Sequence, residues 1–117
     1  MCAGYSEYFQ TGLEGQIMFL NYGNNENKEW VITPQCETVY IQTPLLDIET
    51  CCDHLSLTNG QEYQEFSGRD LVDISISVSD FFTVGFYSDS SVTMDGFILK
   101  WSCSAFDPVK LFILQVV

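Results

Sequence analysis

Basic residues are scarce in this chain of 117 residues. Four lysines and arginines stand against 16 aspartates and glutamates, and the net charge is −12. Nucleic acids and anionic lipid surfaces are bound by clustered Lys and Arg, so neither is an expected partner. The partners that suit such a surface are cations, either metal ions or the Lys and Arg side chains of another protein. The alternative is that the acidity only aids solubility.

Several other signals are missing. No apolar run is long enough to cross a membrane, and the first ten residues, MCAGYSEYFQ, lack the basic start and apolar segment of a secretion signal. We therefore expect no membrane insertion. No two cysteines have C-x-x-C spacing and His54 is the only histidine, which disfavours a Cys/His zinc site. No nucleophile-elbow motif is present, so we predict that the protein is not an enzyme.

Helical periodicity is nearly absent, and alternation of apolar and polar residues takes its place. In residues 72–79, four β-branched residues alternate with Asp and Ser, as in a half-buried strand. Further runs rich in β-branched and aromatic residues predict strands at 15–21, 29–33, 38–46, 54–58, 81–87 and 96–104. Such strands, about ten residues apart and separated by polar turns, predict an all-β antiparallel sandwich.

The length and the pattern together predict one domain. We place it at residues 1–104, because the last strong strand pattern ends there. Residues 105–117 contain an Asp-Pro break followed by KLFILQVV, and we predict a C-terminal appendage that adds a further strand or mediates self-association.

Five cysteines are many for a chain of this length. That density predicts an oxidising compartment and a fold supported by disulfides. Because the number is odd, at least one thiol is free or bonded to another chain.

The segment LDIETCCDHLSL gathers Asp47, Glu49 and Asp53 around the adjacent cysteines Cys51 and Cys52. Two interpretations are open. The carboxylates hold a cation, or the segment is a solvated corner fixed by a disulfide.

Three segments, in order, resemble the CUB domain, an extracellular module found in complement proteases, developmental metalloproteases and nematode secreted proteins. They are GQIMFLNYGNNENKEWVI, LLDIETCCDHLSL and FYSDSSVTMDGFILKW. The first departs from the family pattern at Gly23, which replaces a proline. The resemblance runs from about Cys2 to Cys103. It implies an antiparallel β-sandwich of jelly-roll type in a secreted, non-catalytic protein.

Many CUB domains bind calcium at one end of the sandwich. Carried over by motif, the resemblance implies that Glu49, Asp53 and Asp89 are the ligands, with Ser91 as an auxiliary contact. Calcium takes six to eight oxygen ligands, which carboxylates supply well. Glu49 and Asp53 are four residues apart, a shorter spacing than is usual in the family. The alternative ligand in the place of Glu49 is Asp47.

The resemblance also bears on the cysteines, because the two usual bridges of the family cannot both be drawn. Lys28 occupies the place of one usual cysteine. The layout we predict pairs Cys36 with Cys51 or Cys52, and Cys2 with Cys103. Adjacent side chains in a strand point to opposite faces, so one of the doubled cysteines is predicted to keep a free thiol that could join two chains as a homodimer.

The function implied by the resemblance is calcium-dependent recognition outside the cell, in which the acidic site captures a Lys or Arg of a protein partner. The alternative is a metal-independent module that binds a glycan or assembles structurally through its loop aromatics and the spare thiol. A third possibility is that the acids lie in exposed loops and bind nothing.

Overall fold

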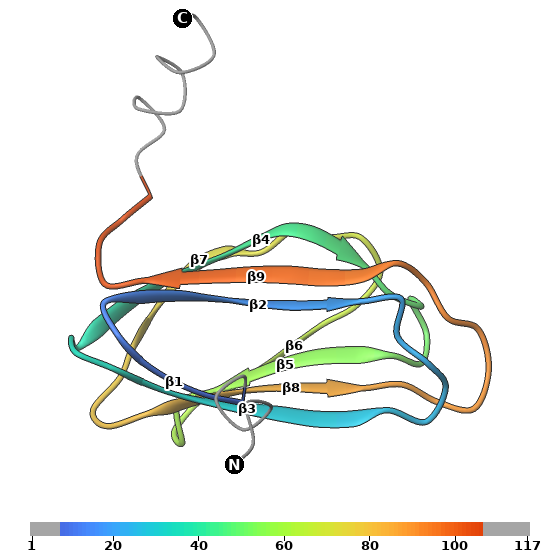
Figure 1. The fold of residues 1–117 in the computed structure, drawn as a ribbon, viewed down its shortest axis with the longest axis horizontal. Coiled ribbons are helices and arrows are strands. Elements are labelled where there is room, and N and C mark those ends of the chain that lie inside the picture. Colours follow the sequence, from blue (N-terminus) through green and yellow to red (C-terminus); the bar gives the residue numbers. More distant parts are fainter. Residues whose placement is uncertain (1–7, 107–117) are drawn as a thin grey trace, which may run out of the picture.

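The protein is a sandwich of two β-sheets in the computed structural model, which describes residues 8–106 (Figure 1). The nine strands within that range are β1 (Phe9–Gly12), β2 (Glu14–Leu20), β3 (Asn27–Pro34), β4 (Thr38–Asp47), β5 (His54–Thr58), β6 (Tyr63–Phe66), β7 (Asp73–Ser77), β8 (Phe82–Tyr87) and β9 (Gly96–Ser102). Within residues 8–106, no helix has the length and hydropathy needed to cross a membrane.

One sheet has five strands in the order β1-β3-β8-β5-β6, and the other has four in the order β2-β9-β4-β7. Every neighbouring pair is antiparallel except β1 and β3, which run parallel. The predicted all-β sandwich of jelly-roll type is therefore confirmed. The sequence pattern did not predict the short strands β1 and β6, or the parallel pair.

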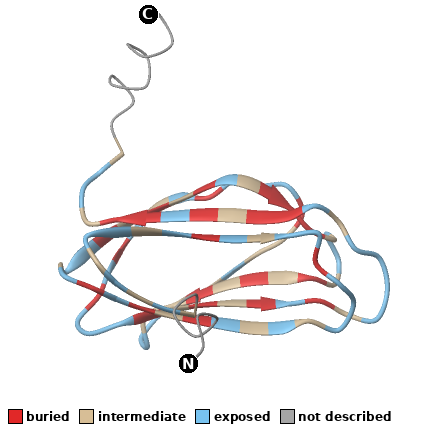
Figure 2. Cartoon of the chain, in the orientation of Figure 1, coloured by how far each residue is buried: buried red, intermediate tan, exposed pale blue. Residues whose placement is uncertain are grey.

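The core lies between the sheets and is built by the alternating residues of each strand (Figure 2). On β8, Phe82, Val84 and Phe86 are 0–2% exposed, whereas Tyr87 on the other face is 51% exposed. The alternation on β9 is of the same kind, with the side chains of Phe97, Leu99 and Trp101 buried. These are the inward faces that a half-buried strand pattern predicts.

The end of β4 is shaped by a bulge. The register of β4 against β9 shifts between Gln42 and Leu45, and Pro44 lies inside that interval. Proline has no N–H to give to the ladder, so an internal strand accepts it only at such an irregularity. The Thr43 side chain accepts a hydrogen bond from the Val72 N–H at 2.7 Å, which ties the bulge to the chain entering β7.

Strands β2, β4 and β8 all end at one pole of the sandwich, and β3, β5 and β9 begin there. In Figure 1 this pole is on the right, where the β2–β3, β4–β5 and β8–β9 connections meet. The antiparallel topology therefore gathers three loops that are far apart in the sequence.

The disulfides differ from the predicted layout. Cys36 is bonded to Cys103, and Cys51 is bonded to Cys52. The first pair forms because the β3–β4 connection and the end of β9 lie at the same pole, opposite the three loops, with a Cα–Cα distance of 5.8 Å. The second pair sits in a turn, so the rule that neighbouring strand side chains diverge does not apply to it.

This pairing corrects three predictions. Cys36 does not bond to Cys51 or Cys52, Cys103 is not available to Cys2, and neither of the doubled cysteines keeps the free thiol proposed for a homodimer. Cys2 itself lies outside the described residues, as does most of the predicted appendage at 105–117. The domain boundary at residue 104 stays a prediction.

Candidate metal centre

Three carboxylates meet at the pole where the loops gather. Glu49 lies in the β4–β5 connection, Asp53 directly precedes β5, and Asp89 follows β8. One carboxylate oxygen of each lies within 4.8 Å of the others. The short spacing between Glu49 and Asp53 does not prevent this, because the chain turns between them and the Asp53 N–H donates to the Glu49 carbonyl at 3.3 Å.

Asp53 is the fixed member of the group. Its side chain is fully buried. The Tyr22 hydroxyl donates to Oδ2 at 2.6 Å, and the Asp89 N–H donates to Oδ1 at 3.1 Å. A buried carboxylate is costly unless it accepts hydrogen bonds, and these two donors come from two different loops. Asp53 therefore joins the β2–β3 and β8–β9 loops to the start of β5.

Glu49 is in the opposite situation. Its Oε1 atom is buried and has no hydrogen-bond partner among the described residues. Desolvation raises the pKa of this carboxyl, and the nearby charges of Asp89 and Asp53 raise it further. A buried carboxylate oxygen without a donor, facing two further acids, lacks the positive charge that would stabilise it.

The loop that carries Asp89 is held by buried Ser88. The Ser88 hydroxyl donates to the Gly23 carbonyl at 2.8 Å and accepts from the Glu26 N–H at 2.8 Å. The Asp89 carbonyl accepts from the Asn25 N–H at 2.7 Å. These contacts, from the Ser88 hydroxyl and the Asp89 main chain, position Asp89 independently of its own carboxylate.

The Asp89 carboxylate itself makes one local contact, in which Oδ1 accepts from the Ser91 N–H at 3.1 Å. Ser91 is exposed and is linked to the group through this backbone contact. Its predicted role as an auxiliary ligand stays a prediction.

Asp47 points to a different partner. Its Oδ1 accepts from Arg69 Nε at 2.8 Å, and its Oδ2 accepts from the Asp95 N–H at 3.4 Å. The Arg69 hydrogen bond holds the pKa of the Asp47 carboxyl below its usual range. Glu49 lies beside Asp53 and Asp89, and the group that these three form does not include Asp47. The role of Asp47 as a substitute ligand stays a prediction.

The geometry suits a hard divalent cation. Calcium accepts a flexible set of carboxylate, carbonyl and water oxygens, and three carboxylates exceed its charge by one. An ion among them would supply the partner that Glu49 Oε1 lacks and would offset the repulsion between the three acids. The residues present therefore fit calcium.

Sequence reasoning missed Tyr22 as part of this site. Its ring is 3% exposed and packs edge-on against Phe86 at a centroid distance of 4.7 Å. Its hydroxyl donates to Asp53 and accepts from the Glu49 N–H at 3.3 Å. Burial and the Asp53 contact raise the pKa of the hydroxyl, which keeps it a donor at neutral pH. The available signal was an aromatic residue in an otherwise polar loop.

No protein-family model matches the chain, and no curated protein matches it either. Solved structures do. The MASP-1 CUB2 domain bound to Ca²⁺ is 22% identical, with a TM-score of 0.71, and the match covers 86% of this chain and 99% of that one.

Two longer proteins also match. The CUB1-EGF-CUB2 domains of rat MASP-1 are 19% identical with a TM-score of 0.70, and 87% of this chain matches 44% of that one. The full extracellular region of zebrafish Gpr126/Adgrg6 is 20% identical with a TM-score of 0.68, and 80% of this chain matches 14% of that one. The chain thus spans less than half of either. At these identities the likeness shows the fold, which is that of a CUB domain.

Proposed function

We propose that this protein is a non-catalytic recognition module that acts outside the cell and binds one calcium ion through Glu49, Asp53 and Asp89. The observation that carries the proposal is Glu49 Oε1, a buried oxygen with no hydrogen-bond partner within residues 8–106, in a group of three carboxylates. The fold and the disulfides are consistent with an extracellular location, and a structural neighbour of the same fold was solved with Ca²⁺ bound.

The ion would order the pole by joining three loops. The three acids leave one negative charge after calcium is bound, and the chain as a whole carries −12. A Lys or Arg side chain of a partner protein is the complementary group, because charge-assisted hydrogen bonds to carboxylates are stronger than neutral ones.

The calcium claim is tested by thermal melts in EDTA and in millimolar calcium. Extracellular calcium sites have dissociation constants of about 10⁻⁴ to 10⁻³ M, so calcium at about ten times that value adds ~1.4 kcal/mol to the free energy of unfolding. For a chain of 117 residues this corresponds to a rise in melting temperature of about 6 °C.

Asp89→Asn should abolish the calcium-induced rise. In EDTA its melting temperature should be no lower than that of wild type, because Asn can still accept from the Ser91 N–H and the variant reduces the repulsion on Glu49. Asp80→Asn is the matched control, since Asp80 is an exposed acid in the β7–β8 connection at the opposite pole. An equal calcium response in wild type and Asp89→Asn would remove Asp89 from the site.

The same two variants test the proposed capture of a Lys or Arg side chain from a partner protein. Binding to a lysine-containing peptide is measured with and without calcium. Asp89→Asn and Asp80→Asn carry the same net charge, so general attraction by an acidic protein is the same in both. The proposal expects calcium-dependent binding that only Asp89→Asn loses; equal losses would reduce the interaction to net charge alone.

A second candidate, metal-independent carbohydrate binding, is favoured by a depression of about 370 Å³ on the outer face of the five-stranded sheet. Tyr63 and Tyr87 line it and are more than half exposed, and His54 stacks on Tyr87 at a centroid distance of 6.4 Å. Exposed aromatic faces beside carboxylates are a suitable surface for a sugar ring.

A glycan array in EDTA discriminates the two functions. Carbohydrate binding predicts a signal that is insensitive to EDTA and is lost in Tyr87→Ala. Phe81→Ala is the matched control, because Phe81 is an aromatic residue of similar exposure that does not line the depression. The absence of any signal from wild type would remove this candidate.

A further inference from the structure

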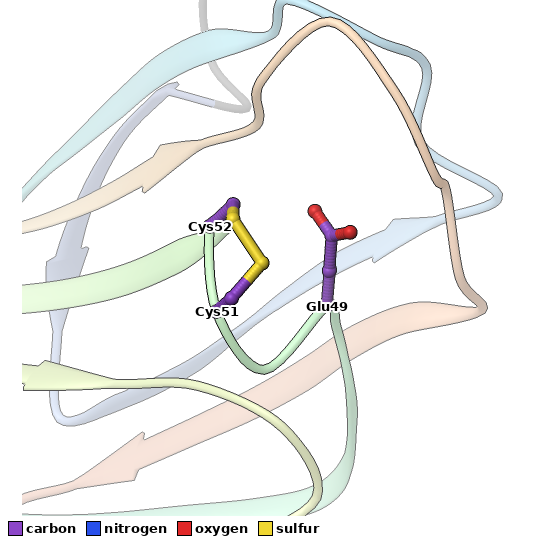
Figure 3. Close-up of side chains that lie close together, drawn as sticks. All are labelled: Glu49, Cys51 and Cys52. Atoms are coloured by element: carbon purple, nitrogen blue, oxygen red, sulfur yellow. A yellow bond between two sulfur atoms is a disulfide. The ribbon is translucent and has the colours of Figure 1, made fainter.

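The disulfide between Cys51 and Cys52 joins residues that are adjacent in the sequence. It lies in the turn between Glu49 and Asp53, and Cys51 is exposed while Cys52 is half-buried. Figure 3 shows the bond beside the Glu49 carboxylate, with both sulfurs on the side of the turn that faces it.

A bond between adjacent residues contributes little to the stability of a fold. In the chain-entropy model, a disulfide acts by closing a loop of the unfolded chain, and its effect grows with the length of that loop. Cys36 and Cys103 are 67 residues apart, whereas Cys51 and Cys52 are one residue apart. By this reasoning the first bond contributes more to the stability of the sandwich, and we expect that the second can open without unfolding it.

The same turn places the two sulfurs next to the Glu49 carboxylate. One oxygen of Glu49 and the sulfurs of Cys51 and Cys52 lie within 4.8 Å of one another. Of the two Glu49 carboxylate oxygens, Oε1 is buried and has no hydrogen-bond partner in the part of the chain that the structure describes. Two thiolates and a carboxylate form a donor set suited to Zn²⁺ or Cd²⁺, which take sulfur ligands in preference to the hard oxygen cages that suit calcium.

We propose that Cys51 and Cys52 are a reducible pair that, once opened by a thiol reductant, joins Glu49 in a binding site for a thiophilic divalent metal ion. A thiolate of the reductant attacks one sulfur and breaks the S–S bond, forming a mixed disulfide. A second thiol of the reductant releases the protein sulfur. The reductant leaves as its own disulfide, and the protein gains two electrons and two protons as two thiols. Metal binding then releases the two thiol protons to solvent.

Reduction is measured first. The protein is treated with increasing concentrations of a thiol reductant, alkylated, and mapped by mass spectrometry. Cys51 and Cys52 should be labelled at reductant concentrations at which Cys36 and Cys103 stay bonded, with the melting temperature almost unchanged. Opening of Cys36–Cys103 first, or unfolding together with opening of the adjacent pair, would overturn the proposal.

Metal binding is measured next, by titrating the reduced protein with Cd²⁺ in the absence of calcium and following thiolate-to-metal absorption in the near ultraviolet. One Cd²⁺ per chain should bind, whereas oxidised protein should give no thiolate signal. Wild type that has been reduced and then alkylated provides a control without any substitution. The double variant Cys51→Ser/Cys52→Ser retains the other three cysteines and should lose the signal. A signal of the same size in that variant would place the ion elsewhere and overturn the site.

The role of Glu49 has its own test. Glu49→Gln should leave reduction of the disulfide unchanged and weaken Cd²⁺ binding by at least about tenfold. Loss of a residue that only supports a metal ligand already has an effect of that size. Glu65→Gln, on β6 outside the group, is the matched control. Wild-type affinity in Glu49→Gln would remove the carboxylate from the proposed site.

One consequence rests on the proposed calcium function. Glu49 belongs both to the group with Cys51 and Cys52 and to the group with Asp53 and Asp89. A Zn²⁺ or Cd²⁺ ion bound to the reduced protein should therefore weaken calcium binding. The calcium proposal and the thiolate-metal proposal are tested under different conditions, so either one can be refuted without the other. Calcium binding is measured on oxidised protein without reductant, and the Cd²⁺ titration contains no calcium.

Discussion

Removal of a single oxygen atom, in the variant Tyr22→Phe, tests how the pole is held together. The Tyr22 hydroxyl is the donor for Asp53 Oδ2 and the acceptor for the Glu49 N–H. The ring is buried against Phe86, and phenylalanine keeps that packing. The substitution therefore isolates the hydrogen bonds of the hydroxyl from the burial of the ring.

The expected loss follows from the burial of Asp53, which is 0% exposed. A hydrogen bond to a charged group contributes about 1.5–3 kcal/mol, and the partner left behind cannot recover it from water. We expect a loss of about 2 kcal/mol. At about 2.1 cal/mol/K per residue, unfolding of 117 residues has an entropy of about 0.25 kcal/mol/K, so the melting temperature should fall by about 8 °C.

The assay is scanning calorimetry in EDTA, so that calcium does not contribute. Tyr87→Phe is the matched control, because Tyr87 is 51% exposed and lies on the outer face of β8. It should shift the melting temperature by little. If Tyr22→Phe and Tyr87→Phe lower it equally, the hydroxyl does not hold Asp53, and the account of the pole is wrong.

Three further perturbations test other parts of the fold. Arg69 lowers the pKa of the Asp47 carboxyl, so their ion pair stabilises the fold at pH values above the ordinary Asp pKa and loses that effect as the pH falls through the lowered pKa. In urea melts, Arg69→Gln should therefore have a lower free energy of unfolding than wild type at pH 7, and this difference should disappear in acid. A difference that does not depend on pH would contradict this. Removing the Cys36–Cys103 bond by a double Ser substitution should cost about 4 kcal/mol in urea melts, as expected for a 67-residue separation, and a loss under about 1 kcal/mol would contradict the entropic argument. Gly96 has φ +104° and a Cβ there would collide with a main-chain carbonyl of β2, so Gly96→Ala should cost at least about 2 kcal/mol, and a neutral result would refute that close contact.

The sequence pattern predicted the strands that bury one face in the core and expose the other to solvent. Residues 72–78 and 82–86 alternate strictly, and the structure buries the side of each that the pattern selects. It missed β1 and β6, which have four residues each and lie at the edges of their sheet. Short edge strands bury too few side chains to leave a pattern, and pairing of β1 with β3 in parallel is set by tertiary structure.

The candidate site was predictable in part, by motif resemblance and not by local pattern. The motifs named Glu49, Asp53 and Asp89, and the structure places them together. The contacts of Tyr22 with Asp53 and Glu49 and the Cys36–Cys103 bond were not predictable from local pattern, because each depends on which loops meet at a pole. A local rule about side-chain direction misjudged Cys51 and Cys52, since it holds in strands and the two residues form a turn.

The most direct test of the calcium claim is a crystal structure of the oxidised protein in millimolar calcium, with anomalous difference density used to locate the ion. One peak is expected at the pole, with carboxylate oxygens of Glu49, Asp53 and Asp89 at about 2.3–2.6 Å from it. A pole without anomalous density at saturating calcium, with Glu49 Oε1 paired to a protein donor, would show that these three residues do not bind calcium.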